Sequence, residues 1–270
     1  MYIFVFLSFA LSLFGLEVPH PWVVYYGDAA QAEELAPFNP IVLQPHSALV
    51  RAFGKRKTVL GYFNLGEIDQ SDPFFSKTQE EGLLIEDNQE WRGSWKVDIR
   101  NPFWKRYVLK TAIPVLLSQG FTGIFLDQVD VSIDLETRNP TQFSGMKKAA
   151  IDLIRDIRKY FPKIKLMLNR GYEILPQIGR WIDYELAETL YTFYDVNTQT
   201  YQVRSKEEYD WQLQQLQAAH KQFPRLVLFS LDYWDPTDRT MIDKIYEIEL
   251  QHFLRPYVAT IHLDKIVLPP

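Results

Sequence analysis

Gly123-Ile-Phe-Leu-Asp127 is a run of small and apolar residues that ends in a carboxylate. A strand of a parallel sheet is covered on both faces, so it reads as a near-continuous apolar run rather than as an alternating one. The run therefore predicts a buried parallel strand, and Asp127 is expected at the end of that strand where a site can open.

Seven further runs of this kind are spread along the chain. They are Trp22-Val-Val-Tyr-Tyr-Gly27, Ile41-Val-Leu-Gln-Pro45, Thr58-Val-Leu-Gly-Tyr-Phe-Asn64, Lys165-Leu-Met-Leu-Asn169, Trp181-Ile-Asp-Tyr-Glu-Leu-Ala-Glu188, Leu226-Val-Leu-Phe-Ser-Leu-Asp232 and Tyr257-Val-Ala-Thr-Ile261. Helical patterns lie between them, including an apolar stripe over 146–157 and a stretch over 103–118 that Pro114 should interrupt. Eight strands alternating with helices predict an α/β fold, a single-domain (β/α)8 TIM barrel over residues 20–268. An open doubly wound sheet is the alternative, but it would lack the eightfold count.

Residues 66–98 form a long acidic stretch after the third predicted strand, and 94–99 within it reads as a short extra strand. In a barrel this stretch lies over the C-terminal face, where substrates bind.

The first 16 residues, MYIFVFLSFALSLFGL, are apolar and too short to span a bilayer comfortably. They read as a signal peptide or an N-terminal anchor, which predicts a secreted or periplasmic protein. Attachment to a membrane follows if the segment is not cleaved.

Composition excludes several classes of function. The 270 residues include no cysteine, which excludes disulfides and thiolate chemistry. Net charge is −5 without a basic block, so no nucleic-acid partner is expected. The five histidines form no metal-binding spacing, and the sequence has no serine-nucleophile elbow or phosphate loop. No metal or cofactor is therefore expected, and the protein is expected to be a monomer.

Polar residues follow or end most of the predicted strands, where a TIM barrel places its active site. The candidates are Asn64 and Glu67 after the third strand, Asp127 and Asp130 after the fourth, Asn169 after the fifth, Glu188 after the sixth and Asp232 after the seventh. Tyr25, Tyr62 and Tyr233 are expected to line the cleft beside them.

Two carboxyl groups across a sugar bond are what glycoside hydrolysis needs, one as an acid and one as a nucleophile or base. Asp127 and Glu188 are the predicted catalytic pair. Asp130 stays open as a rival to Asp127, and strand alternation sends Glu185 to the opposite side from Glu188. A sugar-binding barrel without catalysis is the alternative function. A lyase or aldolase would need a lysine at a strand end, and none is found there.

Gly120-Phe-Thr-Gly-Ile-Phe-Leu-Asp-Gln-Val-Asp130 resembles the fourth-strand signature of glycoside hydrolase family 114, the group that includes endo-α-1,4-polygalactosaminidases. Stretches 61–67, 97–104, 167–171 and 186–190 follow in the family's order. The resemblance implies a (β/α)8 barrel that hydrolyses an amino-sugar polysaccharide, with catalytic acids that map onto Asp127, or Asp130, and Glu188. The family usually has Asp where this chain has Thr122, a position expected to be structural.

Overall fold

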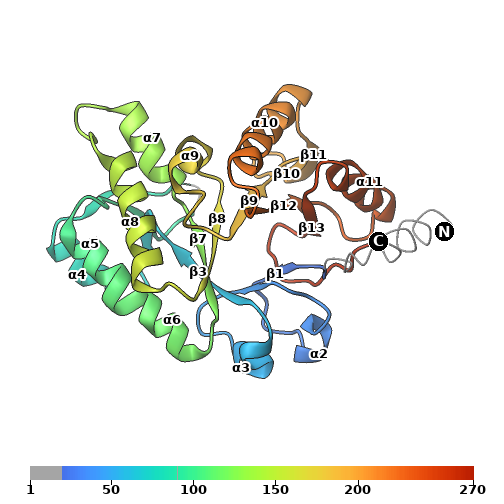
Figure 1. Cartoon of the computed structure of the whole chain (residues 1–270), viewed down its shortest axis with the longest axis horizontal. Coiled ribbons are helices and arrows are strands. Elements are labelled where there is room, and N and C mark those ends of the chain that lie inside the picture. The colour runs from blue at the N-terminus through green and yellow to red at the C-terminus, as the bar shows by residue number, and fades with distance from the viewer. Residues whose placement is uncertain (1–19, 90) are drawn as a thin grey trace.

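The computed structural model describes residues 20–89 and 91–270. Eight parallel strands form one sheet in the order β1-β2-β3-β7-β8-β9-β12-β13 (Figure 1). They are β1 (Val23–Tyr25), β2 (Ile41–Leu43), β3 (Val59–Asn64), β7 (Gly123–Asp127), β8 (Lys165–Asn169), β9 (Tyr184–Glu188), β12 (Val227–Tyr233) and β13 (Arg255–Ala259). Each predicted apolar run overlaps one of these strands, so the predicted α/β barrel is confirmed. The segment read as a signal peptide or anchor lies outside the described residues.

No ladder pairs the two end strands of the sheet, β1 and β13, among the described residues; side chains and one backbone bond, from the Tyr26 N–H to the Leu263 carbonyl at 2.7 Å, connect this seam. The Trp22 indole N–H donates to the Arg255 carbonyl at 2.8 Å. The same ring packs edge-on against Phe229 and Tyr257, with centroids 5.0 and 5.8 Å apart. This large buried side chain therefore holds the seam of a nearly closed barrel.

Helices flank the barrel strands along the chain (Figure 1). They are α2 (Ala32–Leu35), α3 (Val50–Phe53), α4 (Phe75–Glu80), α5 (Pro102–Tyr107), α6 (Ile113–Gln119), α7 (Asp130–Arg138), α8 (Met146–Tyr160), α9 (Leu175–Ile178), α10 (Lys206–Gln222) and α11 (Arg239–Leu250), with short turns η1 (Gly54–Arg56) and η3 (Tyr172–Ile174). The Ser205–Glu208 capping box begins α10 as its spacing predicts.

The predicted interruption at Pro114 takes the form of a π-helical segment, η2 (Val108–Ala112), between α5 and α6. Pro114 is the second residue of α6, directly after this widened turn, so the helix continues past its missing N–H. Thr122 is structural as expected, since its hydroxyl accepts from the Val59 N–H at 2.8 Å and ties the starts of β3 and β7 together.

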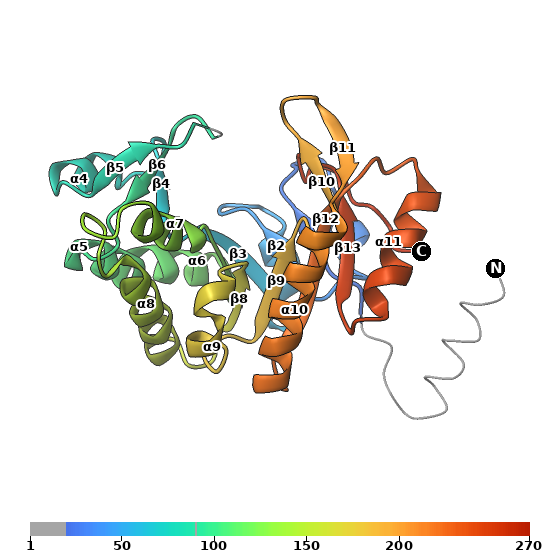
Figure 2. The same ribbon diagram turned by 90° about the horizontal axis from the view of Figure 1, so that it is seen from above.

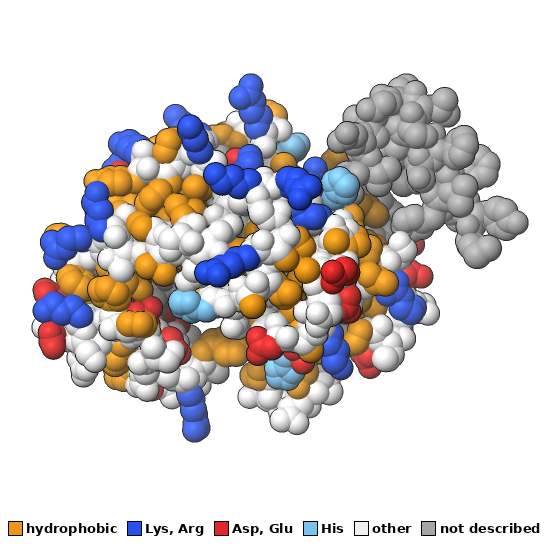
Figure 3. Space-filling model, turned by 90° about the horizontal axis from the view of Figure 1, so that it is seen from below, with side chains coloured by type: hydrophobic (Ala, Val, Ile, Leu, Met, Phe, Trp, Pro, Cys, Tyr) orange, Lys and Arg blue, Asp and Glu red, His pale blue; other side chains and the backbone are white. Residues whose placement is uncertain are grey.

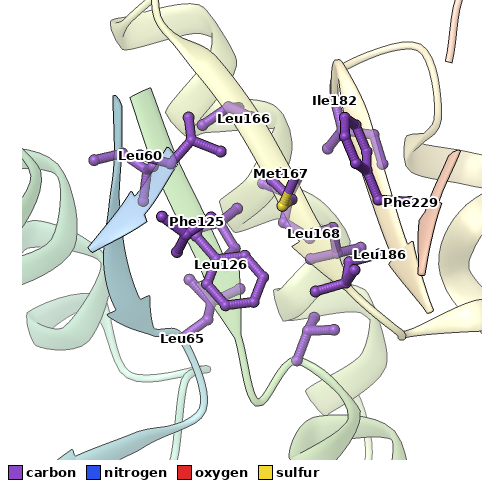
Figure 4. Packing of buried hydrophobic residues seen from close by; sticks show 14 of the residues in the cluster. Leu60, Leu65, Phe125, Leu126, Leu166, Met167, Leu168, Ile182, Leu186 and Phe229 are labelled. Carbon is purple, nitrogen blue, oxygen red and sulfur yellow. The ribbon is translucent and has the colours of Figure 1, made fainter. Parts of the chain in front are cut away.

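Side chains on the inner faces of the strands fill the barrel. Phe125, Met167, Leu186 and Phe229 come from four different strands and pack against one another in the interior (Figure 4). Each is at most 3% exposed. This apolar packing stabilises the strands on which the site is built.

Two small antiparallel sheets are inserted after barrel strands (Figure 2). The first is β4 (Glu67–Asp69), β5 (Leu84–Asp87) and β6 (Ser94–Val97), which follows β3. The second is the hairpin β10 (Thr192–Asp195) and β11 (Thr200–Val203), which follows β9. The sequence predicts the β6 strand but neither its partners nor the hairpin. Both sheets follow strand C-terminal ends, so they extend the face that carries the site.

On the face that Figure 3 shows, charged side chains of both signs are present. Figure 3 shows Lys and Arg side chains spread among hydrophobic and acidic ones over one face of the molecule. That distribution agrees with the lack of a basic block in the sequence.

Candidate active site

Asp127, Asn169 and Glu188 end three consecutive strands, β7, β8 and β9, and their side chains meet. The Asn169 Nδ2 donates to Asp127 Oδ1 at 2.9 Å and to Glu188 Oε2 at 2.6 Å. Asn169 itself is 4% exposed, so the bridge is made away from bulk solvent. One amide group therefore holds two carboxyl groups side by side.

Each of these three residues is followed directly by a non-glycine residue in the left-handed region. The φ angles are +57° at Gln128, +58° at Arg170 and +56° at Thr189. Left-handed backbone is unfavourable for residues with a Cβ, most of all for a β-branched one such as threonine. The chain thus turns sharply after each of these three side chains, and the surrounding contacts must maintain these turns.

Arg204 maintains the turn after Glu188. Its Nε donates to the Thr189 carbonyl at 2.5 Å and its Nη2 donates to the Thr189 hydroxyl at 2.7 Å. Gln212 donates to the same carbonyl at 3.3 Å, and the guanidinium lies 4.8 Å from the Phe193 ring centroid. The planar Arg204 guanidinium therefore fixes Thr189, the residue next to Glu188, through two hydrogen bonds.

Hydroxyl and amide donors surround both carboxyl groups. Tyr62 donates to Asp127 Oδ2 at 3.0 Å, and the Gln128 N–H donates to Asp127 Oδ1 at 2.8 Å. Tyr233 donates to Glu188 Oε1 at 2.5 Å. Burial, together with the nearby carboxylates, raises the pKa of Tyr62 and Tyr233, so both phenols stay protonated as donors.

Burial and the nearby Glu188 carboxylate raise the pKa of Asp127 from 3.8 to about 7. The hydrogen bonds from Asn169 and the Gln128 N–H act in the opposite direction but are outweighed. Two carboxyl groups this close do not both ionise readily, so the pair retains one proton up to about neutral pH.

Tyr25, a predicted site residue, does not face the carboxyl pair, whereas its neighbour Tyr26 does. Tyr25 is 2% exposed and its hydroxyl accepts from the Ala30 N–H at 2.8 Å, so it is part of the packing around β1. Tyr26 contacts the Tyr62 ring instead, with centroids 5.7 Å apart, and the charges of Asp127 and Glu188 help raise its pKa after burial. Because successive side chains of a strand point to opposite faces, only one of the two tyrosines can face the site.

Asp232 does not lie with the other acids, contrary to the expectation that it binds substrate. It is fully buried, and its Oδ1 accepts from the Tyr191 and Thr192 N–H groups at 2.7 and 2.5 Å. Its neighbour Tyr233 faces Glu188. Asp232 therefore anchors the chain that enters the β10–β11 hairpin.

Glu185 and Glu188 separate as strand alternation predicts. Glu185 is fully buried with no hydrogen-bond partner among the described residues, and burial raises its pKa far above the ordinary value. Glu188 is the one that meets Asn169 and Tyr233.

Glu67 and Asp130 lie together in a groove beside the carboxylate pair. This acidic groove encloses about 740 Å³ and is lined by Glu67, Glu86, Asp87, Asn88, Gln89, Lys96, Gln128, Asp130, Val131, Asp134 and Arg138. Glu67 accepts from the Ser94 hydroxyl at 2.6 Å and from Asn88 at 3.0 Å. Burial raises the pKa of Asp130, while the charge of Arg170 partly offsets this. The predicted rival of Asp127 therefore lines the groove and is not bridged to Glu188 by Asn169.

The chemistry available here is that of carboxyl groups, phenols and one amide. No group of three metal-ligating side chains lies together within residues 20–89 and 91–270. Over the same residues, no helix has both the length and the apolar character needed to cross a membrane. The sequence identified Asp127, Asn169, Glu188, Tyr62 and Tyr233. It missed Tyr26, although the Tyr25-Tyr26 doublet left that choice open, and it missed Arg204, for which no sequence signal exists.

Comparison with known proteins places this geometry in context. A family model of glycoside hydrolase family GH114 matches residues 44–268. The structure is similar to the glycoside hydrolase domain of PelA from Pseudomonas aeruginosa, with a TM-score of 0.81 and 24% sequence identity over 93% of this chain and 98% of that one. It is also similar to Aspergillus fumigatus Ega3, crystallised in complex with galactosamine, with a TM-score of 0.67 and 13% identity over 94% and 96% of the two chains.

A curated relative is the uncharacterized protein MJ1477 of Methanocaldococcus jannaschii, which is 26% identical over 133 residues. The match covers 48% of this chain and 37% of that protein, which is well under two thirds of its length.

Proposed function

Since this chain belongs to glycoside hydrolase family GH114, we propose that it cleaves an amino-sugar polysaccharide with Asp127 and Glu188 as the catalytic pair. The observation that carries the proposal is the single Asn169 amide that donates to both carboxyl groups. These two acids are held together at the ends of β7 and β9, with Asn169 of the intervening strand β8 between them, and the reaction requires such a pair.

The separation of the two carboxyl groups favours hydrolysis with retention of configuration. Asp127 Oδ1 and Glu188 Oε2 both accept from Asn169 Nδ2. The distance between these two oxygens therefore cannot exceed the summed lengths of the two hydrogen bonds, about 5.5 Å. Retaining enzymes separate their carboxyl groups by ~5–5.5 Å, whereas inverting enzymes leave ~6.5–9.5 Å for a water molecule between them.

The hydrogen bonds favour Asp127 as the nucleophile and Glu188 as the acid. Asp127 accepts three donors, from Tyr62, Gln128 and Asn169, and these stabilise a carboxylate. Glu188 accepts two, from Asn169 and Tyr233, one donor fewer than Asp127. Asp127 would attack the anomeric carbon while Glu188 protonates the leaving oxygen. Glu188 would then take a proton from the water that releases the sugar from Asp127.

The acidic groove favours a substrate with protonated amines. Five carboxylates and two cations line the groove. Its lining also includes Gln128, the residue after Asp127. The galactosamine bound by Ega3 is a sugar of this kind. We therefore place cationic sugar units of the polymer in this groove.

The apolar run over residues 1–16 supports an enzyme that works outside the cytoplasm. A polysaccharide too large to enter a cell is accessible there.

The test is the release of reducing ends from partly and fully deacetylated galactosamine and glucosamine polymers. Wild type should cleave at least one of them, and Asp127→Asn and Glu188→Gln should each lose activity by ~1000-fold or more. Asp130→Asn is the matched control, since it removes a nearby carboxylate that is outside the pair. Full activity in either of the first two variants, or a greater loss in Asp130→Asn, would refute the assignment.

A further inference from the structure

A second hollow lies at the start of α10, a helix on the other side of the barrel from β4–β6 (Figure 2). This hollow, the Trp211 pocket, has a volume of about 350 Å³. It is lined by Arg170, Arg204, Glu207, Glu208, Trp211 and Gln212. Arg170 directly follows Asn169, and Arg204 is bonded to Thr189, which directly follows Glu188. The acidic groove begins instead at Gln128, next to Asp127. Each hollow therefore includes a residue that directly follows one of the bridged side chains, Asn169 or Asp127.

Trp211 offers a fixed and accessible aromatic surface. Its side chain is 51% exposed, although it lies in the second turn of α10, on a helix that begins near the site. Tyr172 packs against it at a steep angle, with ring centroids 5.6 Å apart, and the Tyr172 hydroxyl donates to Gln212 at 2.9 Å. An aromatic ring held in this way loses little conformational freedom when a flat ligand stacks on it.

The charges of the pocket cancel. Glu208 is occupied by the Ser205 cap and lies 3.4 Å from Arg204, whose other donors bind Thr189. Arg170 and Glu207 form no ion pair within the described part of the chain, so one charge of each sign faces the hollow. The acidic groove, with five carboxylates and two cations, is charged by contrast.

We propose that the Trp211 pocket is a subsite for an uncharged pyranose unit, such as an N-acetylated hexosamine, of the polymer that is cleaved at Asp127 and Glu188. The sugar ring stacks on the Trp211 indole, and the Arg170 guanidinium, which forms no ion pair among the described residues, donates to a hydroxyl or an acetamide oxygen. This subsite rests on the proposed function, because it places a neighbouring unit of the same polymer. It makes the enzyme selective for chains that carry an acetylated unit beside a charged one.

The binding test uses the inactive Asp127→Asn protein and its own tryptophan fluorescence. Titration with an N-acetylated hexosamine oligosaccharide should give a saturable change that disappears in Asp127→Asn/Trp211→Ala. Tyr160→Ala is the matched control, because Tyr160 is similarly exposed, at 53%, but lies at the end of α8 that precedes β8. The same titration with the fully deacetylated oligosaccharide should depend less on Trp211, because the acidic groove binds its protonated amines. Equal loss of the fluorescence change in the Trp211 and Tyr160 variants, or an equal dependence of both oligosaccharides on Trp211, would overturn the proposal.

Kinetics separate the subsite from the proposed function. With the partly acetylated polymer, Trp211→Ala should raise KM by roughly tenfold and leave kcat within about twofold, while Trp211→Phe should retain most of the affinity. If wild type cleaves the polymer and Trp211→Ala leaves KM unchanged, the subsite is wrong and the proposed function stands. If no polymer is cleaved but binding depends on Trp211, the proposed function is wrong and the subsite stands.

Discussion

Replacing Asp127 by asparagine should stabilise the folded protein at alkaline pH while removing its activity. The pKa of Asp127 is about 7 in the folded protein, against an ordinary value of 3.8. Between these values the folded state holds a proton that the unfolded state has released. Stability therefore falls as pH rises through this window, and the full cost is present above about pH 7.

The size of the effect follows from the same two pKa values. At about 1.4 kcal/mol for each pKa unit, the difference between 3.8 and about 7 corresponds to at most ~4 kcal/mol at pH 8. Asparagine fits the same position, because its amide oxygen can accept from Gln128 and Asn169 while Tyr62 turns its hydroxyl to accept from the amide nitrogen. The variant therefore removes the charge without leaving these groups unpaired.

The assay is urea unfolding of wild type and Asp127→Asn from pH 4.5 to pH 8. The free energy of unfolding of the variant relative to wild type should rise by ~2–4 kcal/mol over this range. Asp28→Asn, at an exposed aspartate, should give a curve parallel to wild type. A curve for Asp127→Asn that is also parallel to wild type would show that Asp127 is not held in a site that penalises its charge.

Three further predictions concern catalysis. Asn169→Ala removes the donor shared by the two acids and should lower kcat by ~100-fold. Because the hydrogen bond from Asn169 lowers the pKa of Asp127, its loss should also move the alkaline limb of the pH–rate profile to higher pH. An unchanged alkaline limb would contradict the bridge. Arg204→Lys keeps the charge but loses the paired hydrogen bonds to Thr189, so kcat should fall ~10- to 100-fold. Added guanidinium should partly rescue Arg204→Ala. Equal kcat in wild type and Arg204→Lys would show that Arg204 has no positioning role. In wild type, kcat/KM should decline above about pH 7 as the pair loses its last proton, and a profile flat to pH 9 would argue against a shared proton.

The barrel could be predicted because its strands are buried on both faces, which leaves long apolar runs such as Gly123–Asp127 in the sequence. The β10–β11 hairpin could not, because its strands are largely half-exposed and carry no such run. The sheet that contains β4 and β5 was likewise hidden, since β4 carries two acidic residues among its three and no residue of β5 is fully buried, so neither strand leaves an apolar run.

The errors at the site have one physical origin. Acids at strand ends were found from their position alone, but Tyr25 and Asp232 were each one residue away from the side chain that faces the site. A shift of one residue along a strand exchanges the two faces of the sheet. The register that decides between Tyr25 and Tyr26, or between Asp232 and Tyr233, is set by neighbouring strands distant in sequence. The hydrogen bonds from Arg204 to Thr189 likewise join residues that are distant in the sequence.

The configuration of the newly released sugar tests the central account most directly. Proton NMR of the anomeric signal, recorded in the first minutes of polymer cleavage, should show a product with the same configuration as the bond that was cut, because Asp127 and Glu188 lie too close for an inverting water. A first product of the opposite configuration would contradict the arrangement in which one Asn169 amide joins a nucleophile and an acid.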